Sequence, residues 1–225
     1  FVPLGAGFQA PANYSAAVQY KLDEQGYALG FMGQPPVTAG SNVDFGSIEY
    51  GSKVSVQLYN AGAIVDSYDL VFTNVPVVAL KAETIVDEPK LPGQFSLASG
   101  QFNQNIPFGP MGIEFRGQTS QQFEKKSFSI ELQEADPLVE REIRLLEMRK
   151  DGDWLTDATY RDTTYVRNIV SMDIYNAMRP FAHYTEGSGK GQPAIKGRVV
   201  ELVLNERYHG VYILEEKVDR KLSGV

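Results

Sequence analysis

Apolar and polar residues alternate along much of the first third of the chain. In the stretch 41–74 this alternation places Val54, Val56 and Leu58 on one face of a predicted strand, and a second strand follows the turn at 60–63. Helical periodicity is missing from this part of the sequence. We therefore expect residues 1–74 to form an all-β unit, a β-sandwich-like accessory domain.

From Val75 onward the pattern changes to strands that alternate with a helix. The strands are predicted at 75–80, at 111–117, at 125–132, and on either side of a turn at 205–210. A helix is predicted from about Thr163 to Met178, because apolar residues recur there at every fourth position, and Asp162 or Thr163 can cap it. Residues 75–225 are thus expected to form a second domain of the α+β class, with this helix packed on one face of a sheet.

Composition and charge exclude several classes of function. The chain has 225 residues, 43% of them hydrophobic and 22% charged, which is typical of one or two globular domains. A net charge of -7 argues against nucleic acid as a partner, because most of the surface would repel a phosphate backbone. With no cysteine and two widely separated histidines we expect no metal site, and no apolar run is long enough for a membrane span.

Two motifs that suggest catalysis fail on inspection. Gly189-Lys190 lacks both the upstream glycine and the following serine or threonine of a phosphate-binding Walker loop, so the sequence around it indicates a solvated connection. Ser188 lies between glycines but without the spacing of a hydrolase nucleophile. We interpret Trp154 as a core residue, and Asp153, Asp157 and Asp162 as capping and turn residues.

A series of longer motifs is more informative. In chain order they are FTNVPVVAL, DEPKLPG, GIEFRGQTSQQFEKKSFSIEL, LLEM, GDWLTDATYRDTTYVRN and VELVLNERYHGVYILEEKVDR. Together they span roughly residues 75–220, and in content and order this part of the chain resembles the CotH kinase (spore coat protein H) family, in its bacterial secreted branch.

The resemblance implies an atypical kinase, secreted or at the cell surface, that transfers the γ-phosphoryl group of ATP to protein hydroxyls with Mg²⁺ or Mn²⁺. For residues 75–225 it implies a protein-kinase-like N-lobe, a mixed or antiparallel sheet with one main helix, although the Gly-x-Gly-x-x-Gly loop is absent. The catalytic residues of the family are expected beyond Val225. We therefore expect no phosphoryl transfer by this chain alone.

The same resemblance assigns a role to the positive charge around the predicted hairpin. Arg116, the hydroxyls of Thr119 and Ser120, and either Lys125 or Lys126 are expected to surround the phosphates of a nucleotide. Strand parity favours Lys126, which shares a face with apolar residues of its strand. The alternative from the residues alone is a pair of solvated lysines that discourage edge pairing.

Three further residues are candidates for this site. Arg167 opposes the helix dipole in the first turn of the predicted helix, which indicates a tertiary partner, either a buried carboxylate or a phosphate. The predicted helix has no glutamate to pair with a phosphate-binding lysine, so a substitute carboxylate would come from Asp162, from Glu201, or from beyond the chain.

A second class of function remains open. The CotH-like part can serve as a scaffold for adhesion or for a structural role, with a surface partner in place of a protein substrate. The β-rich first domain suits either function.

Overall fold

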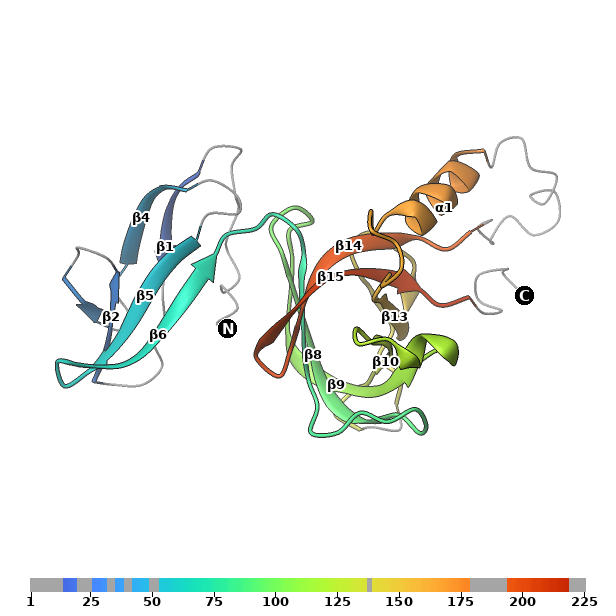
Figure 1. Ribbon diagram of the computed structural model, residues 1–225, viewed down its shortest axis with the longest axis horizontal. Helices are drawn as coiled ribbons and strands as arrows, with labels where there is room; N and C mark the ends of the chain where they lie inside the picture. Colours follow the sequence, from blue (N-terminus) through green and yellow to red (C-terminus); the bar gives the residue numbers. More distant parts are fainter. Residues whose placement is uncertain are drawn as a thin grey trace. The chain divides into compact units, whose positions relative to one another are not determined.

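The computed structural model describes residues 14–19, 26–31, 35–38, 42–48, 53–136, 139–178 and 194–218. The chain divides into two compact units (Figure 1), Val2–Asn74 with Ser99–Asn103, and Val75–Ala98 with Gln104–Val225. The predicted domain boundary between residues 74 and 75 stays a prediction.

The first unit contains two antiparallel sheets. Strand β1 (Tyr14–Gln19) pairs with β4 (Asn42–Ile48), and a four-stranded sheet has the order β3 (Val37–Thr38), β2 (Tyr27–Phe31), β5 (Lys53–Asn60), β6 (Ala63–Val71). The predicted alternation is confirmed in β5, where Val56 is buried while Lys53, Ser55 and Gln57 are exposed. Packing of the two sheets as a sandwich stays a prediction.

The second unit is built on a closed barrel of seven strands in the order β10, β13, β15, β14, β7, β8, β9. Their bounds are β7 Val77–Lys81, β8 Leu91–Ser99, β9 Gln104–Arg116, β10 Ser127–Leu132, β13 Asp153–Asp157, β14 Gly197–Leu204 and β15 Arg207–Glu216. The remaining elements of this unit are the 3-10 helix η1 (Thr119–Gln122), the helix α1 (Arg167–Ala177) and the small sheet of β11 (Ile143–Arg144) and β12 (Lys150–Asp151). Strand β7 runs parallel to β14 and antiparallel to β8.

Alternate residues of the strands fill the barrel. Ile130 of β10 lies opposite Trp154 of β13, and both side chains are inaccessible to solvent. Phe128, Tyr212 and Leu214 are also buried, with at most 2% of each residue exposed. A barrel of this size is filled by side chains, and closure leaves no strand edge exposed. Trp154 is therefore a core residue, as the sequence predicts.

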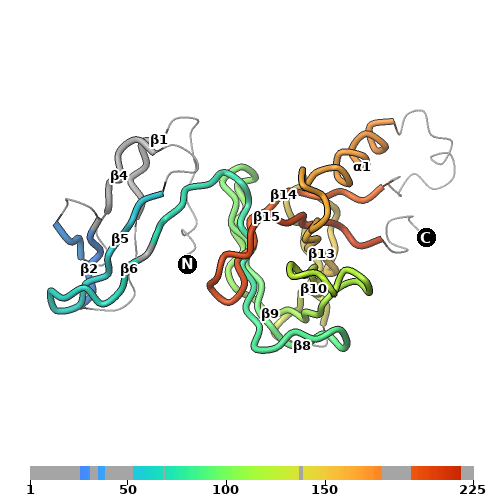
Figure 2. Tube along the Cα trace, viewed as in Figure 1, coloured from blue at the N-terminus to red at the C-terminus, as the bar shows by residue number. Residues whose placement is uncertain are grey.

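The predicted α+β fold with a protein-kinase-like N-lobe is wrong. The strands of this unit close into a barrel, and the only α-helix in the described part of the chain has no buried residue. Val170, Ile174 and Met178, the apolar positions from which the helix was predicted, are 47%, 57% and 54% exposed. Figure 2 shows α1 outside the barrel, beside β14. The fold class is therefore mostly β.

Helix α1 approaches the outer face of the barrel at Gly197. A Cβ atom on Gly197 of β14 would lie 2.7 Å from Cγ2 of Ile169 and 2.8 Å from Cγ2 of Ile213. Glycine thus allows α1 to approach the strands closely. This approach, and the segment 157–166 that leads into α1, form the surroundings of the candidate site.

Candidate functional site

The connection between β9 and β10 folds back tightly on itself. Gly117 has a φ of +98°, and a Cβ there would lie 1.9 Å from Oγ of Ser120. Ser120 in turn donates a hydrogen bond to the carbonyl of Arg116, at 3.4 Å. The glycine that follows β9 therefore lets η1 bring Ser120 next to Arg116.

Lys125 is held by main-chain oxygens and aromatic rings. Its Nζ donates to the carbonyl of Ala158 at 3.1 Å and to that of Val211, and it lies 4.9 Å and 4.2 Å from the ring centroids of Tyr165 and Tyr212. Among the described residues no carboxylate forms an ion pair with it, and burial lowers its pKa although the nearby charge of Asp157 acts to raise it. An ammonium has three N–H donors, of which the two carbonyls occupy two, so one donor remains for a ligand.

A pocket of about 230 Å³ adjoins this ammonium, between the β9–β10 connection and the segment 157–168. We call it the Lys125 pocket; the hydroxyls that line it are those of Ser120, Ser127 and Thr159. Ser127 is engaged, since it donates to Oδ1 of Asp157 at 3.1 Å and accepts from the amide of Ala158 at 2.9 Å. The hydroxyl of Thr159 is buried without a hydrogen-bond partner in the described part of the chain, and its backbone has a φ of +45°.

One wall of the Lys125 pocket is aromatic and cationic. The rings of Phe123 and Tyr160 stack at 5.0 Å, and the guanidinium of Arg161 lies 4.8 Å from the ring of Phe123. The pocket thus offers cationic and hydroxyl donors beside an aromatic surface, which suits an anion with a planar group attached.

A second pocket, of about 190 Å³, lies between α1 and the outer face of the barrel. We call it the Glu215 pocket; its lining includes Arg116, Glu215, Ile169 and Gly197. Asp157 and Asn168 line both pockets. The two pockets therefore adjoin each other, and together they bring Arg116 and Lys125 into one region.

Glu215 is the most perturbed acid of this region. Glu215 is 8% exposed. Burial, and in addition the charge of Asp157, raise the pKa of its carboxyl group to about 7, while the charge of Arg116 acts to lower this pKa. The ion pair to Arg116 is long, with 3.5 Å between Nη1 and Oε1. A buried carboxyl group that titrates near neutrality beside a pocket is a candidate functional group.

The structure brings three of the predicted site residues to these pockets: Arg116, Ser120 and Lys125. Lys126, which strand parity favours, donates instead to the carbonyls of Gln121 and Phe123 within its own loop. Parity misleads here because β10 begins only at Ser127.

Of the other predicted residues, Asp162 lines the Lys125 pocket, whereas Thr119, Arg167 and Glu201 line neither pocket. Thr119 lies in η1, and Arg167 is 71% exposed and pairs with Asp162 at 3.4 Å. Of the two partners considered for Arg167, a carboxylate or a phosphate, the structure shows a carboxylate, that of Asp162. Asp162 also accepts a hydrogen bond from the backbone amide of Arg167 at 2.9 Å. Glu201 lies in β14 and forms a side-chain hydrogen bond with Tyr208. Nucleotide binding by these residues stays a prediction.

Sequence reasoning missed Asp157, Thr159 and Glu215 as site residues. Asp157 does make the turn contact expected of it, since its Oδ1 accepts from the amide of Thr159 at 3.0 Å, but it also faces both pockets. In β15, Glu215 lies between residues that face the barrel interior, so its own side chain faces outward. This charged, outward-facing position was the only signal in the sequence that could have indicated Glu215 as a site residue.

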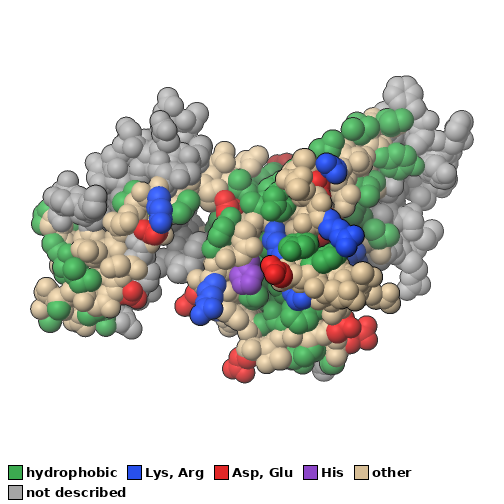
Figure 3. All heavy atoms as spheres, viewed as in Figure 1, with side chains coloured by type: hydrophobic (Ala, Val, Ile, Leu, Met, Phe, Trp, Pro, Cys, Tyr) green, Lys and Arg blue, Asp and Glu red, His purple; other side chains and the backbone are tan. Residues whose placement is uncertain are grey.

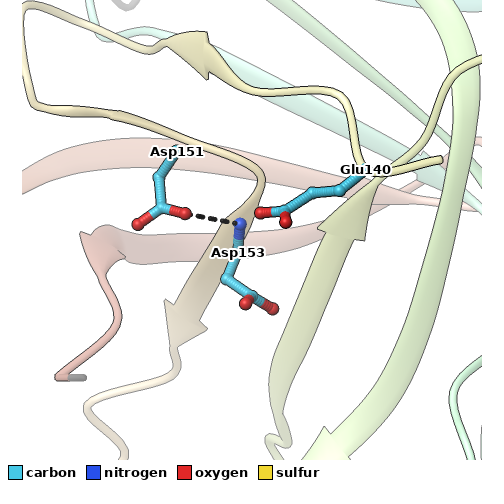
Figure 4. Close-up of side chains that lie close together, drawn as sticks. All are labelled: Glu140, Asp151 and Asp153. Carbon is cyan, nitrogen blue, oxygen red and sulfur yellow. Dashed lines mark hydrogen bonds between the residues drawn. The ribbon is translucent and has the colours of Figure 1, made fainter. Parts of the chain in front are cut away.

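One group of three acids in the described residues resembles a metal site. Carboxylate oxygens of Glu140, Asp151 and Asp153 lie within 4.8 Å of one another, but Figure 4 shows that Asp153 points away from the other two. The group is already neutralised: Arg149 pairs with Asp151 at 2.6 Å, and Lys90 and Lys217 pair with Asp153 at 3.1 Å and 3.4 Å. None of these acids lines either pocket. The group therefore does not fit a metal ion that would accompany a nucleotide.

The surface of the barrel unit shows no continuous basic area on the face seen in Figure 3, where the basic side chains of the described residues are interspersed with acidic and hydrophobic ones. None of the described helices is long and apolar enough to cross a membrane.

Comparison with known proteins gives one match. The family model of CotH kinase protein matches residues 113–224, which include β10, α1 and both pockets' lining residues from Arg116 to Glu215. No curated protein matches the chain. Residues 113–224 thus correspond to a CotH kinase protein domain.

Proposed function

We propose that this chain binds ATP with its phosphates at the Lys125 pocket, and that it serves ATP-dependent phosphoryl transfer to protein hydroxyls. The observation that carries the proposal is the state of Lys125, a partly buried ammonium with a free donor and no ion pair among the described residues. A cation removed from water in this way favours an anionic ligand.

The surrounding groups suit a phosphate chain. Lys125 provides a positive point charge, and the hydroxyls of Thr159 and Ser120 provide neutral hydrogen-bond donors. The planar guanidinium of Arg116, which lines the adjoining Glu215 pocket, provides paired N–H donors. Phosphoryl transfer depends mainly on positioning and on stabilisation of charge, which these groups can provide. Because the group of Glu140, Asp151 and Asp153 lies at neither pocket, we assign no residue of this chain to Mg²⁺ or Mn²⁺.

The protein substrate, and a place of action outside the cell or at its surface, are further parts of the proposal. They rest on the match to the CotH kinase protein family.

A thermal unfolding titration tests nucleotide binding. ATP at a hundredfold excess over its dissociation constant should stabilise the protein by about 2.7 kcal/mol. Adenosine, which lacks the phosphates, should give little or no shift, because Lys125, Thr159 and Arg116 would have no anion to bind.

Equal shifts with ATP and adenosine would contradict a phosphate site, and no shift with either would favour the alternative of a binding module on a CotH scaffold. Transfer of radiolabelled phosphate from ATP to a generic protein substrate, measured with and without Mg²⁺, would overturn the expectation that this chain alone does not transfer phosphate.

A further inference from the structure

We propose that Glu215 competes with the bound phosphates for Arg116, so that anion binding at this site is coupled to the uptake of a proton by Glu215. The inference rests on the proposed function and adds a specificity-determining residue to the same site.

The geometry of the Arg116–Glu215 ion pair suits a contact that a ligand can replace. Charge-assisted bonds between guanidinium and carboxylate are usually about 2.7–2.9 Å long, whereas Arg116 and Glu215 are 3.5 Å apart. The side chain of Arg116 is 43% exposed and that of Glu215 only 10%. Arg116 can therefore turn toward a ligand, while the carboxylate is fixed on β15 at the wall of the Glu215 pocket.

Two charged groups face Glu215 in the Glu215 pocket. From β9 it faces Arg116, which keeps its proton at any ordinary pH, and from β13 it faces the carboxylate of Asp157. Strand β14 contributes Gly197 to the pocket, and α1 contributes Asn168, Ile169 and Met172, none of which titrates.

An anion that binds Arg116 removes the one cation that stabilises ionised Glu215. Two carboxylates would then remain close together with less compensation, and like charges at a shared site favour protonation of one of them. Burial already raises the pKa of Glu215 to about 7. Loss of Arg116 as a partner would raise this pKa further, so binding draws a proton from solution near neutral pH.

Isothermal titration calorimetry with ATP tests this coupling, on the wild-type protein and on Glu215→Gln. If the protonated form of Glu215 is the competent one, its share falls from about nine-tenths at pH 6 to about one-tenth at pH 8, and the wild-type affinity falls about tenfold. The glutamine variant mimics the protonated form and should bind alike at both pH values, apart from the titration of ATP itself, which is common to both proteins. Measurements in buffers of different ionisation enthalpy should show proton uptake by the wild type that the variant lacks.

Equal pH dependence in the two proteins, or equal proton uptake, would overturn the inference while leaving ATP binding intact. Absence of ATP binding by either protein at both pH values would overturn the proposed function and this inference with it. A circular dichroism melt of Glu215→Gln confirms that the variant is folded before the comparison is made, and Glu215→Ala provides a second variant that removes the carboxylate.

Discussion

At the scale of single residues, the site contains a partly buried ammonium, Lys125, and a buried carboxyl group, Glu215, which are compensated in different ways. Lys125 has two carbonyl acceptors and two aromatic rings, which stabilise an ammonium without cancelling its charge. Among the described residues, the carboxylate of Glu215 has only a long ion pair with Arg116. The site is therefore attractive to anions at Lys125 and sensitive to pH at Glu215.

The raised pKa of Glu215 predicts a pH-dependent cost to stability. The pKa is about 7 in the folded protein against a reference of 4.5, so between these values the folded state keeps a proton that the unfolded state has released. Stability from this group is thus present below about pH 4.5 and is lost as pH rises to about 7. Relative to wild type, Glu215→Gln should gain up to about 3 kcal/mol in the free energy of unfolding between pH 4 and pH 8.

Urea unfolding of both proteins at the two pH values measures this difference, because other titrating groups cancel between them. A difference between variant and wild type that is the same at pH 4 and pH 8 would show that Glu215 is not perturbed.

At the scale of elements, the turn between β9 and η1 determines where the donors of the site lie. Gly117 adopts a left-handed φ, and the space its Cβ would fill is occupied by Ser120. The hairpin that carries Arg116 and Lys125 can close in this way only with glycine at that position.

Gly117→Ala should therefore lower the free energy of unfolding by about 2–3 kcal/mol, from backbone strain and a steric clash together. Gly210→Ala is a matched control in the same unit, because its φ of +96° is similar but the nearest atoms to its Cβ, on Lys125, are 4.0 Å away. The control should lose only the strain, about 1 kcal/mol. Equal losses in thermal or urea unfolding would show that Ser120 does not occupy the place described for it.

At the scale of the whole molecule, local patterns were predictable and closure of the barrel was not. The hairpins β9–β10 and β14–β15 and the buried strand β7 follow from alternation and apolar runs near one another in sequence. Strand β8 escaped prediction because Pro92 and Gly93 resemble a loop, yet Gly93 is where β8 approaches β7, with a Cβ position 2.7 Å from the carbonyl of Lys81.

The choice of site residues depends, like closure of the barrel, on contacts between residues far apart in sequence. The hydroxyls and cations near 116–126 were predictable from residue type, but the choice of Lys125 over Lys126 as the pocket residue depends on where β10 begins. Thr159 and Glu215 join the site only because β13 and β15 pair as neighbouring strands of the barrel. Sequence patterns do not contain that pairing.

The central claim is that the Lys125 pocket binds the phosphates of ATP, and the affinity for ATP of two lysine variants tests it most directly. Lys125→Met keeps the length of the side chain but removes its charge, and calorimetry should show a loss of at least tenfold in affinity, since bonds to charged groups contribute about 1.5–3 kcal/mol. Lys126→Met is the matched control, because the Nζ of Lys126 binds only carbonyls of its own loop among the described residues, and it should bind ATP within about twofold of wild type. Equal affinities of Lys125→Met and wild type, or a larger loss in Lys126→Met, would contradict the account.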